Sequence, residues 1–346
     1  MTQALSAAAQ LVSVDAARST AMRRLFAEVF GHDMSAELWH WKYADGRGLA
    51  VGLQVELECG EGPEAELLAH VGGVPREAVL GGQRVRALQL CDVMVASAAR
   101  RSLARNGPLR QLTAHLLETQ IGWTAPHAIG YGFPTERAFA VAERLGLYAK
   151  VDGMVCVTWP TESAADLATE IERWAPSAQR LTDAAAVERG PLAATLDGLG
   201  QAMIDSLPGL TQCVRSAAWV AHRYLRHPSF EYEVHLLRRR WSRRPLGVLV
   251  LRRHETHLEW VDTLAAVGDW ESVRRAACRR AQELQLPQVE AWITRSQQQR
   301  LLDLAPGQAS VRALGIDIPA NVHSAGPGVE ALRDRWLLMA GDTDFR

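Results

Sequence analysis

Lysine is almost absent from this sequence: Lys42 and Lys150 are the only two among 38 basic residues, and arginine supplies the rest. Acidic residues number 39, so the formal net charge is −1. A chain with so even a balance has no overall electrostatic attraction to nucleic acid or to anionic lipid. We attribute the arginine preference to the base composition of the source genome, and we expect neither a nucleic acid nor a membrane as partner.

Long hydrophobic segments are also missing. No apolar run approaches the roughly 20 residues that span a bilayer, and the N-terminus has no basic start followed by an apolar block, as a signal peptide would. Apolar residues make up 48% of the chain and charged residues 22%, which predicts a packed core. At 346 residues the chain is long enough for two domains. We expect a cytoplasmic protein.

The cysteines show neither metal-ligand nor redox spacing. They are five, an odd number, and they lie far apart in the sequence. Zinc sites and dithiol motifs need pairs at short spacing. We therefore expect buried free thiols and no metal site. The five are Cys59, Cys91, Cys156, Cys213 and Cys278.

The first half of the chain has the pattern of alternating strands and helices. Asp15 would cap a helix that Gly31 ends, and Pro108 suits the first position of another helix. Gly81-Gly82 between two apolar runs predicts a hairpin. The expected elements are a strand at 10–15, a helix at 16–31, strands at 48–58, 65–80 and 83–97, a helix at 108–122, a strand at 127–134, a helix at 135–146 and a strand at 149–159. This order is a mixed α/β unit.

The same pattern recurs after residue 177. "AQRLTDAAAV" resembles "QLVSVDAARS", and "WVAHRYLRHP" resembles "LWHWKYADG" in having Trp, a basic residue, Tyr and a turn. Two strands, a helix and a strand follow, and "WLLMAGDTDF" would supply a last strand. We infer an internal duplication, although so few matching residues also fit chance similarity. The predicted domains are 1–160 and 177–346, joined by a linker at 161–176.

The order of these elements resembles that of the GNAT superfamily of acyl-coenzyme A-dependent N-acyltransferases. "HVGGVPREAVLGGQRVRALQLCDVMV" is similar to the family's two central strands, and "RRSLARNGPLRQLTAHLLE" stands where the family has its pyrophosphate loop and the following helix. "AIGYGFPTERAFAVAERLGLY" resembles the next strand and helix. The resemblance implies a tandem of two domains, each a mixed, mostly antiparallel sheet flanked by helices, with the second copy degenerate.

The loop before Pro108 is the most diagnostic stretch and also the one that departs from the family. A helix N-terminus binds a diphosphate when glycines let the preceding amides converge on it. Here the family's paired glycines are missing, and arginines with an Asn-Gly pair, for which we expect φ above zero, would have to replace them. The alternative is a solvated basic loop without a ligand. The loop residues that would hold the coenzyme A diphosphate are Arg100, Arg101, Ser102, Arg105, Asn106, Gly107 and Leu109.

The resemblance also implies a position for the thioester. In this fold the thioester carbonyl bonds to backbone amides of the strand before the loop, which are here those of Val93, Met94 and Val95. The co-substrate would be acetyl-coenzyme A or another acyl-coenzyme A, and no metal is needed.

Three side chains are candidates for catalysis. Asp92 interrupts an apolar strand, Tyr131 lies between two glycines on the adjoining strand, and His70 lies on a central strand. Each could transfer a proton, and each could equally serve a structural role. Many family members protonate the leaving thiolate with a Tyr at the position that is Ala142 here. Tyr148 is a possible substitute.

Two charged segments of the second copy bear on whether it binds a ligand. In the second copy Asp269 and Glu271 begin the helix that would face a diphosphate, so we do not expect coenzyme A there. "HLLRRRWSRRP" could grip phosphate or nucleic acid, but we assign it to a solvated hairpin.

The predicted function is transfer of an acyl group from coenzyme A to the amine of a small molecule by direct attack, by a monomer or homodimer. The acceptor would lie in the cleft between the two domains. Two alternatives remain: a non-catalytic tandem fold that binds a ligand or a protein, and a transferase whose donor is aminoacyl-tRNA or acyl carrier protein.

Overall fold

The computed structural model describes residues 10–44, 47–59, 62–100, 107–161 and 176–345. The chain forms two compact units. The N-terminal unit contains Met1–Arg76, Val85–Lys150 and Ile318–Ala331, and the C-terminal unit contains Glu77–Arg84, Val151–Asp317 and Leu332–Arg346. Both are mixed α/β structures, as predicted.

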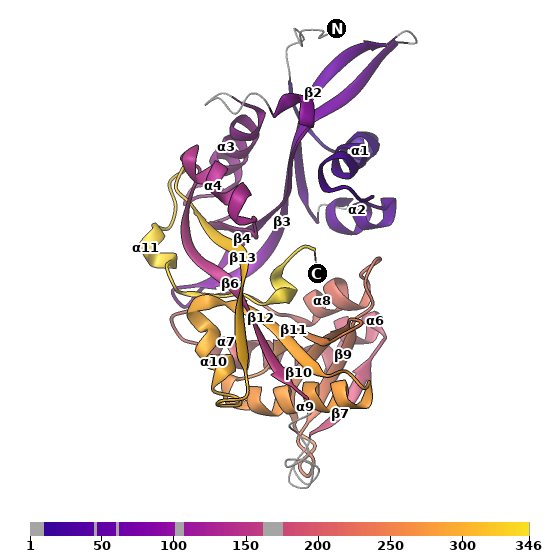
Figure 1. The fold of residues 1–346 in the computed structure, drawn as a ribbon, viewed down its shortest axis with the longest axis vertical. Helices are drawn as coiled ribbons and strands as arrows, with labels where there is room; N and C mark the ends of the chain where they lie inside the picture. Colours follow the sequence, from indigo (N-terminus) through magenta and orange to yellow (C-terminus); the bar gives the residue numbers. More distant parts are fainter. Residues whose placement is uncertain (1–9, 45–46, 60–61, 101–106, 162–175, 346) are drawn as a thin grey trace. The chain divides into compact units, whose positions relative to one another are not determined.

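The sheet of the N-terminal unit has the order β1-β2-β3-β4-β5 (Figure 1). β1 and β2 pair antiparallel, as do β2 and β3, whereas β4 and β5 are parallel. β3 and β4 form the predicted hairpin, in which Gly81 and Gly82 have φ of 57° and 80°. The elements are β1 Gln10–Ser13, α1 Ser19–Phe30, α2 Ala36–Tyr43, β2 Leu49–Cys59, β3 Gly62–Leu80, β4 Gln83–Val95, α3 Pro108–Gln120, β5 Ile129–Tyr131 and α4 Glu136–Arg144.

Helices cover both faces of this sheet (Figure 1). On one face Phe26 of α1 and Trp39 of α2 pack with Met94 of β4. On the other face Leu116 of α3 packs with Leu88 of β4. Neighbouring side chains of β4 therefore enter two separate cores, Leu90 the one with Leu116 and Cys91 the one with Phe26. The caps predicted from the sequence are present: the Asp15 side chain accepts from the Arg18 amide, and Gly31 ends α1 with a φ of 75°.

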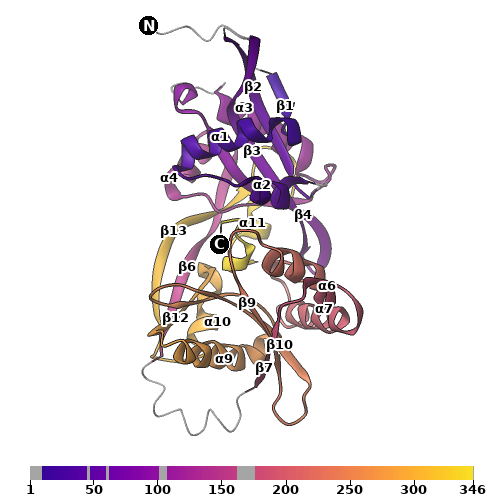
Figure 2. The same ribbon diagram turned by 90° about the vertical axis from the view of Figure 1, so that its right-hand side faces the viewer.

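The second sheet has the order β13-β6-β12-β11-β10-β9-β7. β11 and β12 are parallel, whereas the pairs β12–β6, β11–β10, β10–β9 and β9–β7 are antiparallel. Figure 2 shows α7 and α9 beside β10, and both helices contact β10 and β11. The elements are β6 Tyr148–Pro160, β7 Ser177–Leu181, α6 Ala184–Glu188, α7 Gly190–Asp205, β8 Thr211–Cys213, α8 Ala217–Val220, β9 Glu233–Arg238, β10 Pro245–Arg253, β11 Leu258–Leu264, α9 Trp270–Glu283, β12 Gln288–Thr294, α10 Gln298–Leu302, β13 Ser310–Asn321, α11 Val329–Leu332 and β14 Trp336–Leu337.

Three features differ from the sequence pattern. β6, assigned from the sequence to the first domain, pairs with β12 from Gln288↔Pro160 to Thr294↔Met154, so Val151–Pro160 belongs to the C-terminal unit. β13 was not predicted, because its first half is exposed and it contains Gly315 and Pro319, which weaken a strand pattern.

The last strand expected at "WLLMAGDTDF" is shorter than predicted. Trp336–Leu337 forms β14 and pairs with β8, and Met339 forms a single antiparallel bridge with Ile293 of β12 in the second sheet. The chain then turns into a short 3₁₀ helix at Ala340–Asp342, which ends the extended run.

Neither a membrane-spanning helix nor a disulfide is found among the described residues. No helix there is both long and apolar enough to cross a membrane. The four cysteines whose side chains are described, at positions 91, 156, 213 and 278, are buried free thiols, as expected.

Candidate functional site

The candidate site lies where β4 runs beyond its pairing with β5. The parallel register covers three pairs, from Ala87↔Ile129 to Gln89↔Tyr131, and β4 continues to Val95. Within this free end Asp92 has a φ of 46°, which is uncommon for a residue other than glycine and typical of a β-bulge. The bulge re-aims the backbone of Asp92 and its neighbours at the strand end.

The Asp92 carboxylate is held by two residues at the end of α2. Lys42 Nζ lies 2.8 Å from Asp92 Oδ2, and the two side chains are 5% and 6% exposed. The Tyr43 hydroxyl donates to the same oxygen. Gly72 leaves room for this ring, since a Cβ there would lie 2.2 Å from the Tyr43 hydroxyl.

These contacts determine the protonation states of Asp92 and Tyr43. Burial would raise the pKa of Asp92, but the Lys42 ammonium, with hydrogen bonds from Lys42 and Tyr43, outweighs it and holds the pKa below the usual value. Burial and the Asp92 charge raise the pKa of Tyr43 well above 10. Asp92 is therefore an ionised acceptor and Tyr43 a protonated donor near neutral pH.

His70 lies on β3 and contacts the Asp92 backbone. Its Nδ1 is 2.8 Å from the Asp92 carbonyl oxygen. A carbonyl only accepts, so Nδ1 carries the proton and Nε2 presents a lone pair. Nε2 is buried and has no hydrogen-bond partner among the described residues. Burial lowers the pKa of His70, which makes it a neutral imidazole whose acceptor nitrogen is buried and unpartnered within the described residues.

Tyr131, the third predicted catalytic residue, is the last residue of β5 and is fully buried. Its hydroxyl donates to Gln89 Oε1 across the β4–β5 pair at 3.3 Å. The structure thus brings Asp92 and His70 together. Tyr131 instead links β5 to β4 at the last residue pair of their register.

The residues predicted to bind the thioester and the diphosphate come after Asp92 in the sequence. Val93 is exposed, Met94 is buried and Val95 is partly buried. Arg100 Nε donates to the Val95 carbonyl at 2.9 Å. Leu109 lies in the first turn of α3 and is partly buried. Arg101, Ser102, Arg105 and Asn106 lie outside the described residues.

The prediction of φ above zero at Gly107 is wrong. Gly107 caps α3 with a φ of −70° and a ψ of 161°. It precedes Pro108, and the residue before a proline is pushed into the extended region. Pro108 itself occupies the first turn of α3, as predicted.

A carboxylate lies at the start of the loop. Glu28 of α1 accepts from both the Ser97 amide and the Ser97 hydroxyl at 2.7 Å. The hydrogen bond from the Ser97 amide is the main cause that lowers the pKa of Glu28. This amide therefore already has an anionic partner within the chain.

Lys42 and Tyr43 were not among the predicted site residues. The signal that could have found them is their repetition in the second copy. Ser35 and Ser216 each cap a helix, and Tyr43 and Tyr224 each follow eight residues later. The Tyr224 hydroxyl donates to Asp262 Oδ2 at 2.6 Å, as Tyr43 does to Asp92.

In the second copy, the position equivalent to Asp92 is filled by a buried ion-pair network. β11 has a bulge between the pairs Asp262↔Val250 and Trp260↔Leu251. Arg215 bridges Asp262 and Asp342 at 2.6 Å each, and all three side chains are at most 1% exposed. This network is a filled core.

The start of α9 in the second copy is also occupied. Asp269 pairs with Arg239 at 2.7 Å, and Trp270 is fully buried, with its Nε1 donating to the Ala265 carbonyl. An acid and a buried ring thus stand where the first copy has its loop.

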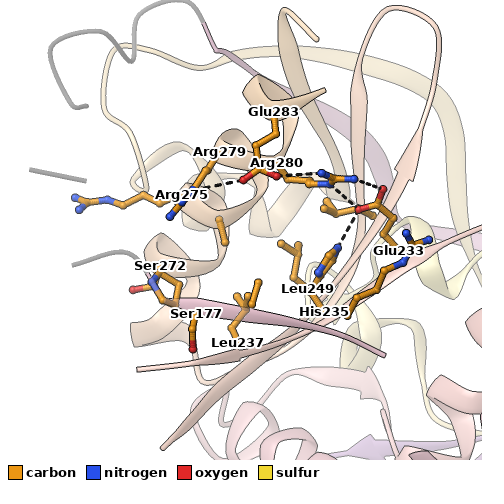
Figure 3. Close-up of a pocket in the computed structure, with 15 residues that line it drawn as sticks. Ser177, Glu233, His235, Leu237, Leu249, Ser272, Arg275, Arg279, Arg280 and Glu283 are labelled. Carbon is orange, nitrogen blue, oxygen red and sulfur yellow. Dashed lines mark hydrogen bonds and ion pairs between the residues drawn. The ribbon is translucent and has the colours of Figure 1, made fainter. Parts of the chain in front are cut away.

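The C-terminal unit contains a separate pocket of about 500 Å³ between α9 and the strands β7, β9 and β10 (Figure 3). On one side Arg280 binds both oxygens of Glu233, at 2.8 and 2.9 Å, and His235 contacts Glu233 at 3.0 Å. The Arg280 hydrogen bonds lower the pKa of Glu233 to about 2. Arg275 and Arg279 of α9 also line the pocket, and they pair with Glu271 and Glu283, so acids of the same helix compensate these arginines.

Neither a protein-family model nor a curated protein sequence matches the chain. Solved structures do match it. A conserved protein of Enterococcus faecalis described as a probable N-acyltransferase has a TM-score of 0.67 at 14% identity, over 94% of this chain and 74% of that one. A GCN5-related N-acetyltransferase of Kribbella flavida has a TM-score of 0.62 at 16% identity, over 92% and 72%.

The N-myristoyltransferase of Saccharomyces cerevisiae, solved with bound myristoyl-coenzyme A, has a TM-score of 0.53 at 10% identity, over 94% of this chain and 81% of that one. Matches of this extent cover both sheets of the chain. The chain therefore has the tandem fold of the GNAT N-acyltransferases, as its sequence pattern predicted.

Proposed function

We propose that this protein is an N-acyltransferase that moves an acyl group from acyl-coenzyme A to an amine of a small molecule. The observation that carries the proposal is the free, bulged end of β4, where strand pairing with β5 has stopped and α3 follows. Such an end presents backbone amides that are not used by a neighbouring β5 residue. The solved structures of the same fold include acyltransferases, which supports the proposal.

In the proposed reaction, the amine nitrogen attacks the thioester carbonyl carbon and the carbon–sulfur bond then breaks. The amides of Val93, Met94 and Val95 would stabilise the negative charge on the carbonyl oxygen. The acceptor ammonium first gives one proton to the base, which passes it to solvent. During the attack the nitrogen loses a second proton and the coenzyme A sulfur gains one, so the overall transfer is balanced without a metal or a redox partner.

We assign the base to His70 rather than to Asp92. His70 is neutral, its Nδ1–H is fixed on the Asp92 carbonyl, and its buried Nε2 has no hydrogen-bond partner among the described residues; in the proposed reaction this nitrogen would take the ammonium proton through a water that enters with the substrate. Asp92 is already ionised and engaged by Lys42 and Tyr43. Its proposed role is to position the bulge that orients His70.

Melting the protein with and without coenzyme A tests the proposal. A ligand at 100 times its dissociation constant stabilises the folded state by about 2.7 kcal/mol, which raises the melting temperature. Replacing Arg100 and Arg101 together by Ala should abolish the shift, while replacing the exposed Arg253 should preserve it. An unchanged melting temperature at millimolar coenzyme A rejects the donor.

The second candidate is a non-catalytic member of the fold. The Glu28 carboxylate on the Ser97 amide favours it, because a carboxylate at the start of the loop repels a diphosphate. In that case coenzyme A would not stabilise the protein. Aminoacyl-tRNA and acyl carrier protein remain alternative donors, and each can be tested in the same melting experiment.

A further inference from the structure

The pocket of the C-terminal unit lies at a step between α9 and the edge of the sheet. α9 packs on β10, β11 and β12, while β9 and β7 continue the sheet beyond β10. The pocket occupies this step with about 500 Å³, a volume within the range of small-molecule sites. On the sheet side it is lined by Leu237, Leu249 and Leu251, which are at most 1% exposed. These leucines offer little apolar surface, so the charged side chains around them decide what the pocket can bind.

Four arginines line the pocket, and each has an acid beside it. The charges of these pairs cancel, so the pocket has no net attraction for an ion of either sign. Positive and negative groups nevertheless lie next to each other around the cavity. The pairs are Arg180–Glu231, Arg275–Glu271, Arg279–Glu283 and Arg280–Glu233.

The Arg280–Glu233 pair is a fixed part of the wall. Arg280 donates to both oxygens of Glu233, at 2.8 and 2.9 Å, and to Glu283 Oε2 at 3.0 Å. Figure 3 shows this side chain reaching from α9 to Glu233 of β9. Each nitrogen of the Arg280 guanidinium therefore already has a carboxylate partner. We do not expect this pair to open for a ligand.

The Arg279–Glu283 pair is loose by comparison. Arg279 Nε lies 3.5 Å from Glu283 Oε1, and the two side chains are 49% and 50% exposed. Among the described residues this contact is an ion pair without a hydrogen bond. A half-exposed pair of this kind adds little to stability, so its two groups can turn to a ligand at small cost. The pocket thus offers N–H donors of a cation beside an acceptor oxygen of an anion.

We propose that this pocket binds a free amino acid, whose carboxylate contacts Arg279 and whose ammonium contacts Glu283. An α-amino acid carries both charges on one carbon, so its two groups can reach a cation and an anion that lie side by side. Both contacts are charge-assisted hydrogen bonds. The ligand has no net charge, as the pocket has none. All the lining residues belong to the C-terminal unit, and the site does not depend on the proposed acyl transfer.

An ion of a single sign fits the pocket less well. An anion bound to Arg279 would lie close to the Glu283 carboxylate, which is 3.5 Å from that guanidinium. A cation bound to Glu283 would lie close to Arg279 in the same way. Each contact would be offset by a repulsion of similar range. A ligand with both charges answers each group with its opposite.

Melting of the full chain with each of the common L-amino acids at millimolar concentration tests the proposal. At least one should raise the melting temperature, and its analogues without the amine or without the carboxylate should not. For L-leucine these analogues are 4-methylpentanoate and 3-methylbutylamine. Titration calorimetry should show that Arg279→Gln and Glu283→Gln each weaken binding about tenfold. Arg253→Gln and Glu255→Gln are the matched controls, because both residues are exposed in the same unit and lie outside the pocket lining.

Three results would overturn the proposal: no amino acid that raises the melting temperature, an analogue with one charge that binds as tightly as the amino acid, or unchanged binding in Arg279→Gln. The last result would place the amino acid elsewhere, such as at the acceptor site of the proposed reaction. Melting temperatures without ligand confirm that each variant folds. The response to coenzyme A should be the same in wild type and Arg279→Gln, so failure of this site is distinguishable from failure of acyl transfer.

Discussion

Lys42 Nζ lies 2.8 Å from Asp92 Oδ2 inside the N-terminal unit, with both side chains almost fully buried. One of the only two lysines in the chain is thus used to neutralise a carboxylate on a bulged strand. Removing one partner of a buried pair leaves an uncompensated charge, which is more costly than losing the pair's mutual attraction.

Lys42→Met should therefore lower the free energy of unfolding by about 3–5 kcal/mol, measured by urea denaturation. The double variant Lys42→Met, Asp92→Asn should recover part of the loss. Arg84→Met, which breaks an exposed pair with Glu77, serves as control and should cost at most about 1 kcal/mol. A loss for Lys42→Met as small as the control's would mean that Asp92 is not charged in the folded state.

Gly72→Ala should destabilise the N-terminal unit through Tyr43. A Cβ at position 72 would lie 2.2 Å from the Tyr43 hydroxyl, and Gly72 has no positive φ, so the effect is steric. Overpacking of this kind costs about 1–3 kcal/mol. Adding Tyr43→Phe removes the closest atom and should restore part of the stability. Purely additive losses in the double variant would show that the two residues do not collide.

His70→Gln should reduce kcat for acyl transfer about 10²- to 10⁴-fold, the usual contribution of a general base, with the coenzyme A melting shift preserved. His32→Gln, an exposed histidine of the same unit, should have no effect. Burial lowers the pKa of His70 below 6.5. A base must be deprotonated, so wild-type kcat/KM should fall only as the pH drops below that value. Unchanged kcat in His70→Gln would remove His70 from the reaction.

The Glu233–Arg280 pair should stabilise the C-terminal unit in a defined pH window. The folded pKa of Glu233 is about 2 against an ordinary value of 4.5. A group with a depressed folded pKa stabilises above its unfolded pKa and loses that effect as the pH falls. The difference in unfolding free energy between wild type and Glu233→Gln should thus be full above pH 4.5 and shrink toward pH 2. A difference that grows on acidification would contradict the assignment.

Local signals in the sequence predicted most of the fold. Asp15 caps a helical turn, Pro108 begins α3, and Gly81-Gly82 turns a hairpin, because each acts on backbone within three residues of itself. β13 escaped prediction, since its strand is held by pairing with a distant partner rather than by its own pattern.

The site was only partly predictable. Asp92 and His70 were candidates as polar residues on apolar strands, and they do lie together. The contact of Asp92 with Lys42 spans 50 positions and depends on a positive φ that no local motif announces. The prediction of a positive φ at Gly107 was wrong for a local reason. The adjacent Pro108 restricts the Gly107 backbone to the extended region more strongly than the Asn-Gly pair favours a turn.

The most direct measurement for the whole account is release of free coenzyme A thiol from an acyl-coenzyme A in the presence of a panel of small amines. We expect amine-dependent thiol release by the wild type, in step with formation of the amide product, and loss of both in His70→Gln. If no amine of the panel raised thiol release above the uncatalysed rate, with any acyl-coenzyme A tested, acyl transfer would be contradicted as the function of this chain.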